Sequence, residues 1–248
     1  MGFLKLFKKE DNSNVELNET EKVLANSILI FTDDNQHKEF LFKFNRKKFF
    51  DGYRKAFGPL NDSLVESLDV LLDQIECDDR FKVIGDFKTP RRQLAYCLAT
   101  FKWETAHTMR PIKEYGGNDY FNRRYGPQTK VGKVLGNTKS GDGAKYPGRG
   151  FVQLTGKNNY IKAGKYCNID LVNNPEKACD AKIAYKIAIV GMLEGWFTGK
   201  KLSDYFKDGE IPKWESARRI INGVDKAAKI ASIAQQFDEI LLNSLISI

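Results

Sequence analysis

Histidine and closely spaced cysteine pairs are scarce in this chain of 248 residues. It has two histidines, His37 and His107, and four cysteines, none of them in a C-x-x-C pair. Because structural zinc sites are built from such pairs and from histidine, we expect no metal site. Nothing in the pattern suggests a cofactor either. We expect the cysteines to be free thiols, since nothing marks the chain for secretion.

Long apolar runs are also missing. No segment approaches the roughly 18 apolar residues that indicate a transmembrane helix. The first nine residues are basic and apolar, but they lack the longer apolar run and the small-residue cleavage site of a signal peptide. We therefore expect a protein without a transmembrane segment that is cytoplasmic in the cell that produces it.

The charge balance is basic. Forty Lys and Arg face 32 Asp and Glu, a formal net charge of +8. Such a charge favours an anionic partner: nucleic acid, an anionic membrane face or a bacterial cell wall. A basic surface with no dedicated partner is the plainer interpretation. The basic residues are scattered and do not cluster with aromatic residues on one element, so we expect no nucleic acid.

The hydrophobic pattern is helical from about residue 46 onward. Phe49, Phe50, Tyr53 and Phe57 recur at helical spacing, and Gly58-Pro59 ends the run. We predict a mainly α fold with long irregular loops between residues 115 and 150. The further predicted helices are 63–75, one that begins at Thr89-Pro90, a buried helix 181–197, 214–222 and 226–245.

We interpret the first 45 residues as a small N-terminal extension and residues 46–248 as the main domain. Ser27 to Phe31 and Phe40 to Phe44 are short β-leaning runs, and the polar residues between them predict a β-hairpin. Two strands alone are only marginally stable, so the hairpin should pack on the main domain or on a partner.

Two carboxylates stand out. Glu104 follows Cys97 and Phe101 at helical spacing, which places it on the apolar face of the third helix. Partial withdrawal from water favours the protonated form of a carboxyl group, as a general acid needs. A Glu that pairs with Arg or Lys at the helix end is the alternative. Glu114 lies beyond Pro111, where its side chain can remain solvated and ionised. One protonated and one ionised carboxyl group are the requirement for glycoside hydrolysis.

The stretch from Tyr146 to Tyr160 is rich in glycine and in neutral hydrogen-bonding groups. Gly148 and Gly150 permit close approach of a ligand to the backbone. The amides and hydroxyls suit sugar hydroxyls and N-acetyl groups, and Thr155 can hold a water molecule. The same stretch has no phosphate-loop spacing. Its polar and aromatic candidates for sugar contacts are Gln153, Asn158, Asn159, Tyr146, Phe151 and Tyr160.

These segments carry a resemblance. Residues 102–107 followed by 114–117 (KWETAH and EYGG) are similar to the catalytic segment of family 19 glycoside hydrolases. Residues 135–138, 141–143 and 146–160 resemble the substrate loop of that family, and residues 217–223 resemble its late helix-turn motif. The similarity covers roughly residues 46–245 and is greatest to the lysozyme-like branch of phage endolysins and bacterial cell-wall hydrolases. One departure is Trp103, where the family usually has His.

The resemblance implies a lysozyme-like domain that cleaves β-1,4 bonds by an inverting mechanism. Glu104 would be the general acid, Glu114 the general base, and Thr155 would position the attacking water. The implied sugar-binding residues are Gln153, Asn159 and Asn222, to which the substrate loop adds Tyr146, Arg149 and Tyr160.

We expect peptidoglycan as the substrate and chitin as the alternative, with no cofactor and a monomeric enzyme. An endolysin-type enzyme without a signal peptide would act on the cell wall after release, and association with a virion is the other location considered. A glycan-binding module, or a catalytically inactive hydrolase, is the interpretation from a different functional class.

Overall fold

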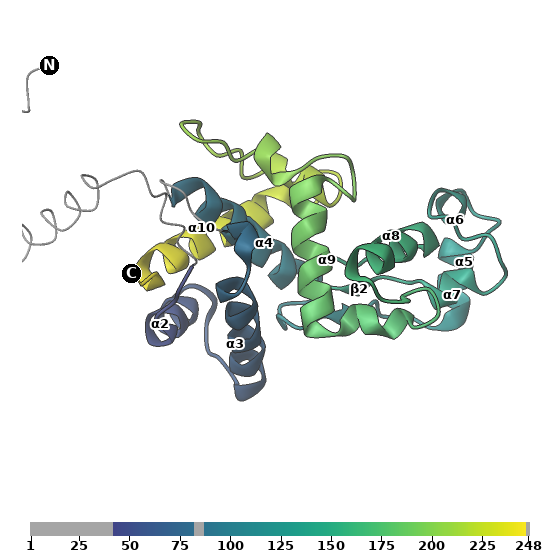
Figure 1. Ribbon diagram of the computed structural model, residues 1–248, viewed down its shortest axis with the longest axis horizontal. Coiled ribbons are helices and arrows are strands. Elements are labelled where there is room, and N and C mark those ends of the chain that lie inside the picture. The colour runs from purple at the N-terminus through teal and green to yellow at the C-terminus, as the bar shows by residue number, and fades with distance from the viewer. Residues whose placement is uncertain (1–41, 82–86, 247–248) are drawn as a thin grey trace, which may run out of the picture. The chain divides into compact units, whose positions relative to one another are not determined.

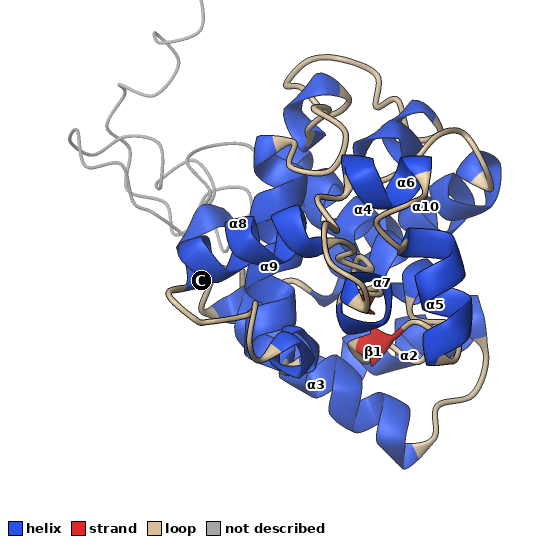
Figure 2. Cartoon of the chain, turned by 90° about the vertical axis from the view of Figure 1, so that its right-hand side faces the viewer, coloured by secondary structure: helices blue, strands red, loops and turns tan. Residues whose placement is uncertain are grey.

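The computed structural model describes residues 42–81 and 87–246. Helices dominate these residues, and strand β1 (Ile112–Lys113) is the short strand visible in Figure 2. It pairs antiparallel with β2 (Arg149–Gly150). The α-helices are α2 (Arg46–Phe57), α3 (Asp62–Glu76), α4 (Lys88–Glu104), α5 (Asn118–Tyr125), α6 (Lys130–Val134), α7 (Asp142–Lys145), α8 (Lys157–Cys167), α9 (Ala181–Glu194) and α10 (Ala227–Ser244). Short 3₁₀ helices are η1 (Asp79–Phe81), η2 (Pro175–Cys179), η3 (Leu202–Asp204) and η4 (Ser216–Ile220).

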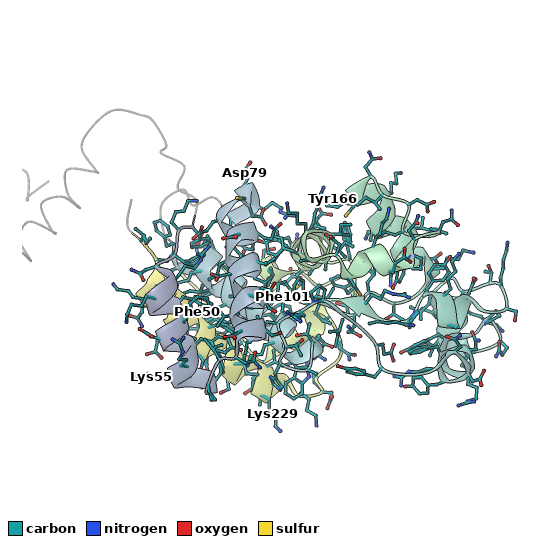
Figure 3. The ribbon with its side chains drawn as sticks, turned by 90° about the horizontal axis from the view of Figure 1, so that it is seen from below. Phe50, Lys55, Asp79, Phe101, Tyr166 and Lys229 are labelled. Atoms are coloured by element: carbon teal, nitrogen blue, oxygen red, sulfur yellow. The ribbon has the colours of Figure 1, made fainter. Side chains whose placement is uncertain are left out.

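Helix α4 lies at the centre of the main core. The C-terminal helix α10 packs along α4 and also against α2, so the two ends of the helical domain meet (Figure 1). Arg91 of α4 donates a 2.7 Å hydrogen bond to Asp238 of α10. Figure 3 shows Phe101 of α4 inside this domain, where it is fully buried, with Lys55 and Lys229 at its surface. Because Glu104 ends α4, the packing of this helix also fixes the position of that carboxylate.

Most of the predicted long helices are confirmed as α2, α3, α9 and α10. Two ends differ. Helix α4, predicted to begin at Thr89-Pro90, begins at Lys88 with Phe87 at its N-cap, so Thr89 lies inside the first turn. Helix α9 ends at Glu194 because Gly195 adopts a left-handed conformation (φ 76°), which glycine reaches without steric cost.

In two regions the helix content differs from the prediction: one contains more helix than expected, and the other contains less. The segment 115–150, predicted as irregular, holds α5, α6 and α7, which are 8, 5 and 4 residues long. Helices this short give too few turns for a hydrophobic period to be recognised. Conversely, the helix predicted over 214–222 reduces to the 3₁₀ helix η4.

The last residues of the expected N-terminal extension belong to the helical core. Phe42 and Phe44 are almost completely buried, and Phe44 bridges antiparallel to Leu245 after α10. Asn45 donates its backbone N–H to Ser244, and Ile246 donates to Lys43. The first strand and the turn of the predicted hairpin lie outside the described residues, and the boundary at residue 45 stays a prediction. Within the described ranges, no helix is long and apolar enough to cross a membrane.

Candidate active site

Glu104 is the last residue of α4, and its side chain is 17% exposed. Nη1 of Arg218, in η4, donates a 2.6 Å hydrogen bond to its Oε1. Arg218 is buried, and its Nε also donates to the carbonyl of Asp225. An ion pair at the helix end is the alternative that the sequence predicts for Glu104, and the structure contains one. Two elements far apart in sequence therefore fix the orientation of the Glu104 carboxylate.

The chain turns sharply directly after Glu104. Ala106, His107 and Met109 have φ values of 50°, 67° and 54°, a left-handed region that residues other than glycine seldom adopt. The Thr105 hydroxyl accepts a 3.1 Å hydrogen bond from the backbone N–H of Met109, whose side chain is buried. Strained backbone of this kind is concentrated at functional sites, where surrounding structure enforces it.

Trp103, which replaces the family's usual His, is half-buried. Its ring packs edge-on against the ring of His107, with centroids 5.8 Å apart. Burial lowers the pKa of His107, and the charge of nearby Lys102 lowers it further. The indole therefore contributes to the packing of the turn that follows the acid.

Glu114 follows β1 directly and is half-buried. Its carboxylate accepts hydrogen bonds from the Tyr125 hydroxyl (3.0 Å to Oε1) and from the backbone N–H of Gly148 (3.1 Å to Oε2). In return, the Glu114 backbone N–H donates to the Gly148 carbonyl at 2.8 Å. Burial, followed by the charge of Glu114, raises the pKa of Tyr125, which keeps this phenol protonated and able to donate. Instead of a fully solvated loop side chain, the structure shows a carboxylate held by two donors.

Gly148 has a steric reason to be glycine. A Cβ atom there would lie 2.7 Å from Oε1 of Gln153 and 3.3 Å from Oε2 of Glu114. Gln153 itself has a left-handed backbone (φ 54°), and its side-chain amide donates to the carbonyl of Ile112 at 3.2 Å. The absence of a side chain at Gly148 therefore leaves room for both the Gln153 amide and the Glu114 carboxylate beside one backbone position.

Thr155 and Asn159 extend this polar group. The Thr155 hydroxyl donates to the Gln153 carbonyl at 2.8 Å, and the Asn159 amide donates to the Thr155 carbonyl at 2.7 Å. Both residues are half-buried. The predicted residues Glu114, Gln153, Thr155 and Asn159 are thus joined by a continuous set of contacts.

Asn222 follows η4, the 3₁₀ helix that carries Arg218. It is exposed, and its backbone N–H donates to the Arg218 carbonyl at 3.0 Å. Phe101, one turn before Glu104, stacks on Phe151, which follows β2, with ring centroids 4.8 Å apart. This stack connects the group around Glu104 to the strand pair that carries Glu114.

Three aromatic residues and one arginine that we expected at the sugar do not face it. Tyr146, Phe151 and Tyr160 are almost fully buried, so they have no free ring face for a sugar, and that expectation is corrected. Arg149 is also buried, and it donates to the Tyr160 hydroxyl at 2.8 Å. The Tyr160 hydroxyl donates in turn to the Pro147 carbonyl. These side chains support the substrate loop from behind.

Two site residues were not singled out by the sequence analysis. Arg218 lies within the late motif at residues 217–223, but nothing in that motif names its partner. Tyr125 lies eleven residues after Glu114. Only the folded position of α5 shows that its hydroxyl donates a hydrogen bond to the Glu114 carboxylate. Over residues 42–81 and 87–246, no three His, Cys, Asp or Glu side chains lie close enough together to hold a metal ion.

Comparisons with known proteins find chitinases among the relatives of this chain. The family model for chitinase class I matches residues 65–224. An acidic endochitinase of Petunia hybrida is 36% identical over 111 residues, which cover 44% of this chain and 38% of that protein. Endochitinase A2 of Pisum sativum is 30% identical over 177 residues, covering 62% and 52% respectively. The chain thus spans about half the length, or less, of these curated relatives.

A solved structure shows the same fold. The crystal structure of chitinase C from Streptomyces griseus HUT6037 aligns with a TM-score of 0.50 at 18% identity, covering 80% of this chain and 78% of that one. The prediction of a mainly α, lysozyme-like domain is confirmed.

Proposed function

This chain belongs to the class I chitinase family, family 19 of the glycoside hydrolases, and we propose that it hydrolyses β-1,4 bonds of an N-acetylated glycan. The observation that carries the proposal is the pair of differently held carboxylates. Glu104 is tied to Arg218, whereas Glu114 is held by Tyr125 and Gly148. Two carboxyl groups in different surroundings suit the separate roles of acid and base.

In the proposed reaction, Glu104 gives its proton to the oxygen of the leaving sugar as the glycosidic C–O bond breaks. Glu114 takes a proton from water, and the hydroxyl forms the new C–O bond from the opposite face of the ring. Thr155 orients that water, with its hydroxyl oxygen available to accept a hydrogen bond. The outcome is inversion at the anomeric carbon, with no cofactor.

We propose peptidoglycan glycan strands as the substrate. The support is the net charge of +8 and the resemblance to the endolysin branch. The muramic acid and peptide stems of peptidoglycan carry carboxylates, so a basic protein is attracted to them. Chitin is the second candidate, favoured by the endochitinase names of the relatives. In the endolysin interpretation, the protein acts on the wall after release from the cell that makes it.

Digestion of purified bacterial sacculi and of chitin oligomers tests the proposal. Mass spectrometry of the muropeptides identifies the bond that is cut. Activity on sacculi should fall as added salt shortens the screening length to about 8 Å, whereas activity on neutral chitin should depend little on salt. Faster turnover of chitin than of sacculi at every salt concentration would make the protein a chitinase. If the protein hydrolyses neither substrate, the interpretation as a glycan-binding module is favoured instead.

Proton NMR of the first product tests the mechanism separately. Cleavage of a β-linked oligomer with inversion releases the α-anomer, which mutarotates slowly enough to be observed. An initial β-anomer would exclude the inverting scheme.

A further inference from the structure

Arg124, in the last turn of α5, has an unusual environment for an exposed arginine. Its guanidinium carbon lies 5.8 Å from the ring centre of Tyr120 and 5.3 Å from that of Tyr125. Nη1 donates a 2.6 Å hydrogen bond to the Tyr120 hydroxyl. Two rings and one hydrogen bond therefore hold an exposed cation in a fixed place.

The position of Arg124 is close to the proposed base. Tyr125, on whose ring the guanidinium lies, donates its hydroxyl to Glu114. Tyr120 contacts the same segment, because a Cβ atom at Gly116 would lie 2.7 Å from its ring. Tyr115, between Glu114 and Gly116, is 75% exposed. Arg124 is therefore one aromatic ring away from the proposed catalytic base.

The guanidinium of Arg124 is exposed, although the charges of Tyr125 and then of Glu114 act on it and raise its pKa. No carboxylate among the described residues lies within ion-pair distance of it. Arg46, Arg91, Arg110 and Arg218, by contrast, each pair with a carboxylate.

The surrounding segment, residues 113–145, has seven Lys and Arg against three Asp and Glu. One of these acids is Glu114, and another, Asp142, is buried and accepts from the backbone of Thr138 and Lys139. The electrostatic potential around Arg124 therefore favours an anion.

We propose that Arg124 binds a carboxylate carried by the glycan, on a sugar substituent or an attached peptide, and so makes the enzyme selective for acidic over neutral strands. This inference rests on the proposed function and names the residue that sets its substrate class. A planar guanidinium held by aromatic rings matches a carboxylate in two parallel hydrogen bonds and loses little side-chain entropy on binding. The competing role is local, since an arginine in the last turn of a helix also stabilises the negative end of the helix dipole.

Arg124→Gln and Arg123→Gln form a matched pair of variants. Arg123 is the preceding, exposed residue of α5, so its substitution removes the same charge from another side of the helix. Each variant is assayed on native sacculi and on sacculi whose carboxylates have been amidated. The selectivity is the ratio of kcat/KM on native to amidated sacculi. We expect Arg124→Gln to lower this ratio about tenfold, equivalent to about 1.4 kcal/mol, mainly through KM. Arg123→Gln should keep it within about twofold of the wild type, because it leaves the proposed contact in place.

An unchanged ratio in Arg124→Gln overturns the proposal, and so does an equal fall with both variants. A lower melting temperature with an unchanged ratio assigns Arg124 to the helix end alone. A second measurement separates this inference from the proposed function. Sedimentation of Glu104→Gln and Glu104→Gln/Arg124→Gln with native and amidated sacculi reports binding without turnover. If the wild type cleaves neither substrate, the proposed hydrolytic function is wrong. The role of Arg124 is then judged from binding alone: loss of the preference for native sacculi in the double variant supports it, and an unchanged preference contradicts it.

Discussion

Arg218 donates a 2.6 Å hydrogen bond to Glu104 across 114 residues of sequence. The arginine is buried and the glutamate nearly so, so this contact sets the direction in which the carboxylate points. A general acid must present its proton at one place, and a fixed rotamer is the simplest way to achieve this.

Glu104→Gln preserves the size of the side chain and its ability to accept from Arg218, but it has no acidic proton to transfer. We expect turnover to fall roughly 10²–10⁴-fold, as for loss of a general acid. Initial rates on sacculi and on chitin oligomers give the result, with circular dichroism to confirm the fold. A folded variant that works near the wild-type rate would remove Glu104 from the chemistry.

Thr155 combines a proposed catalytic contact with an observed structural one, since its hydroxyl already donates to Gln153. Thr155→Val keeps the shape and loses the hydroxyl, whereas Thr155→Ser keeps the hydroxyl. We expect Val to lower kcat at least about tenfold, within the range for positioned acid–base contacts. Ser should restore most of the rate.

The comparison of kcat with melting temperature distinguishes the two roles of Thr155. A catalytic role lowers the rate per folded molecule. A large fall in melting temperature with an unchanged rate per folded molecule would make the residue purely structural.

Phe42 tests whether the helical domain depends on residues before α2. It is 1% exposed and lies against Phe44, Phe81 and Phe87. Phe42→Ala in the full chain should cost about 3–5 kcal/mol of unfolding free energy, as for other buried phenylalanines. Denaturant unfolding measures it. Lys43→Ala, at a half-exposed neighbour, is the control and should change little. If Phe42→Ala lowered the unfolding free energy no more than Lys43→Ala, Phe42 would contribute little to the stability of the core.

Lys102 should make stability depend on pH. Its ammonium group is buried, donates to the Tyr53 hydroxyl at 2.6 Å and lies over the rings of Tyr53 and Phe57. Burial lowers the pKa of Lys102 from 10.5 to about 8. Between these values the unfolded chain binds more protons, so unfolding free energy should rise with pH from 8 to 10.5. Below pH 8 the cost of the buried charge is fully present.

The variant Lys102→Met/Tyr53→Phe removes this titration without leaving the phenol unpartnered. The difference in unfolding free energy between wild type and variant should change by on the order of 1–3 kcal/mol across the window. In the unfolded chain Tyr53 loses its proton near pH 10.0, whereas burial raises its pKa to about 12 in the folded protein, so above pH 10.0 Tyr53 opposes the Lys102 effect. The comparison is therefore made between pH 8 and 10.0, and the pKa of His107 is lowered, away from this range. A difference that is constant between these two pH values would contradict the prediction.

The sequence predicts the helices well where an apolar period runs over several turns. Phe49, Tyr53 and Phe57 define α2 in this way. A second apolar stripe, on α4, leads to Glu104. It does not predict the partner of Glu104, because no local pattern relates Arg218 to a residue 114 positions earlier. Long-range ion pairs depend on how helices pack.

The aromatic residues of the substrate loop show a second limit. Residue type indicates that Tyr146 and Tyr160 are suited to sugars, but it does not say on which side of the loop they lie. The structure buries both. The exposed ring next to Glu114 in the chain is that of Tyr115, for which residue type alone predicts no role. Tyrosine occurs in both settings because it combines an apolar ring with a polar tip.

The reciprocal hydrogen bonds between Glu114 and Gly148 close the chain on itself, with α5, α6 and α7 contained in the excursion between them. Both ends of this excursion meet at the Glu114–Gly148 hydrogen bonds, so residues added to its outer turns do not move these two ends apart. Lengthening a closed loop is inexpensive, at about 0.6 kcal/mol for each doubling. Within the 33 residues from 115 to 147, Tyr125 is the constraint because its hydroxyl donates to Glu114. Extension of the outer turns that keeps Tyr125 in place is therefore expected to change the substrate range while Glu114 keeps both of its donors.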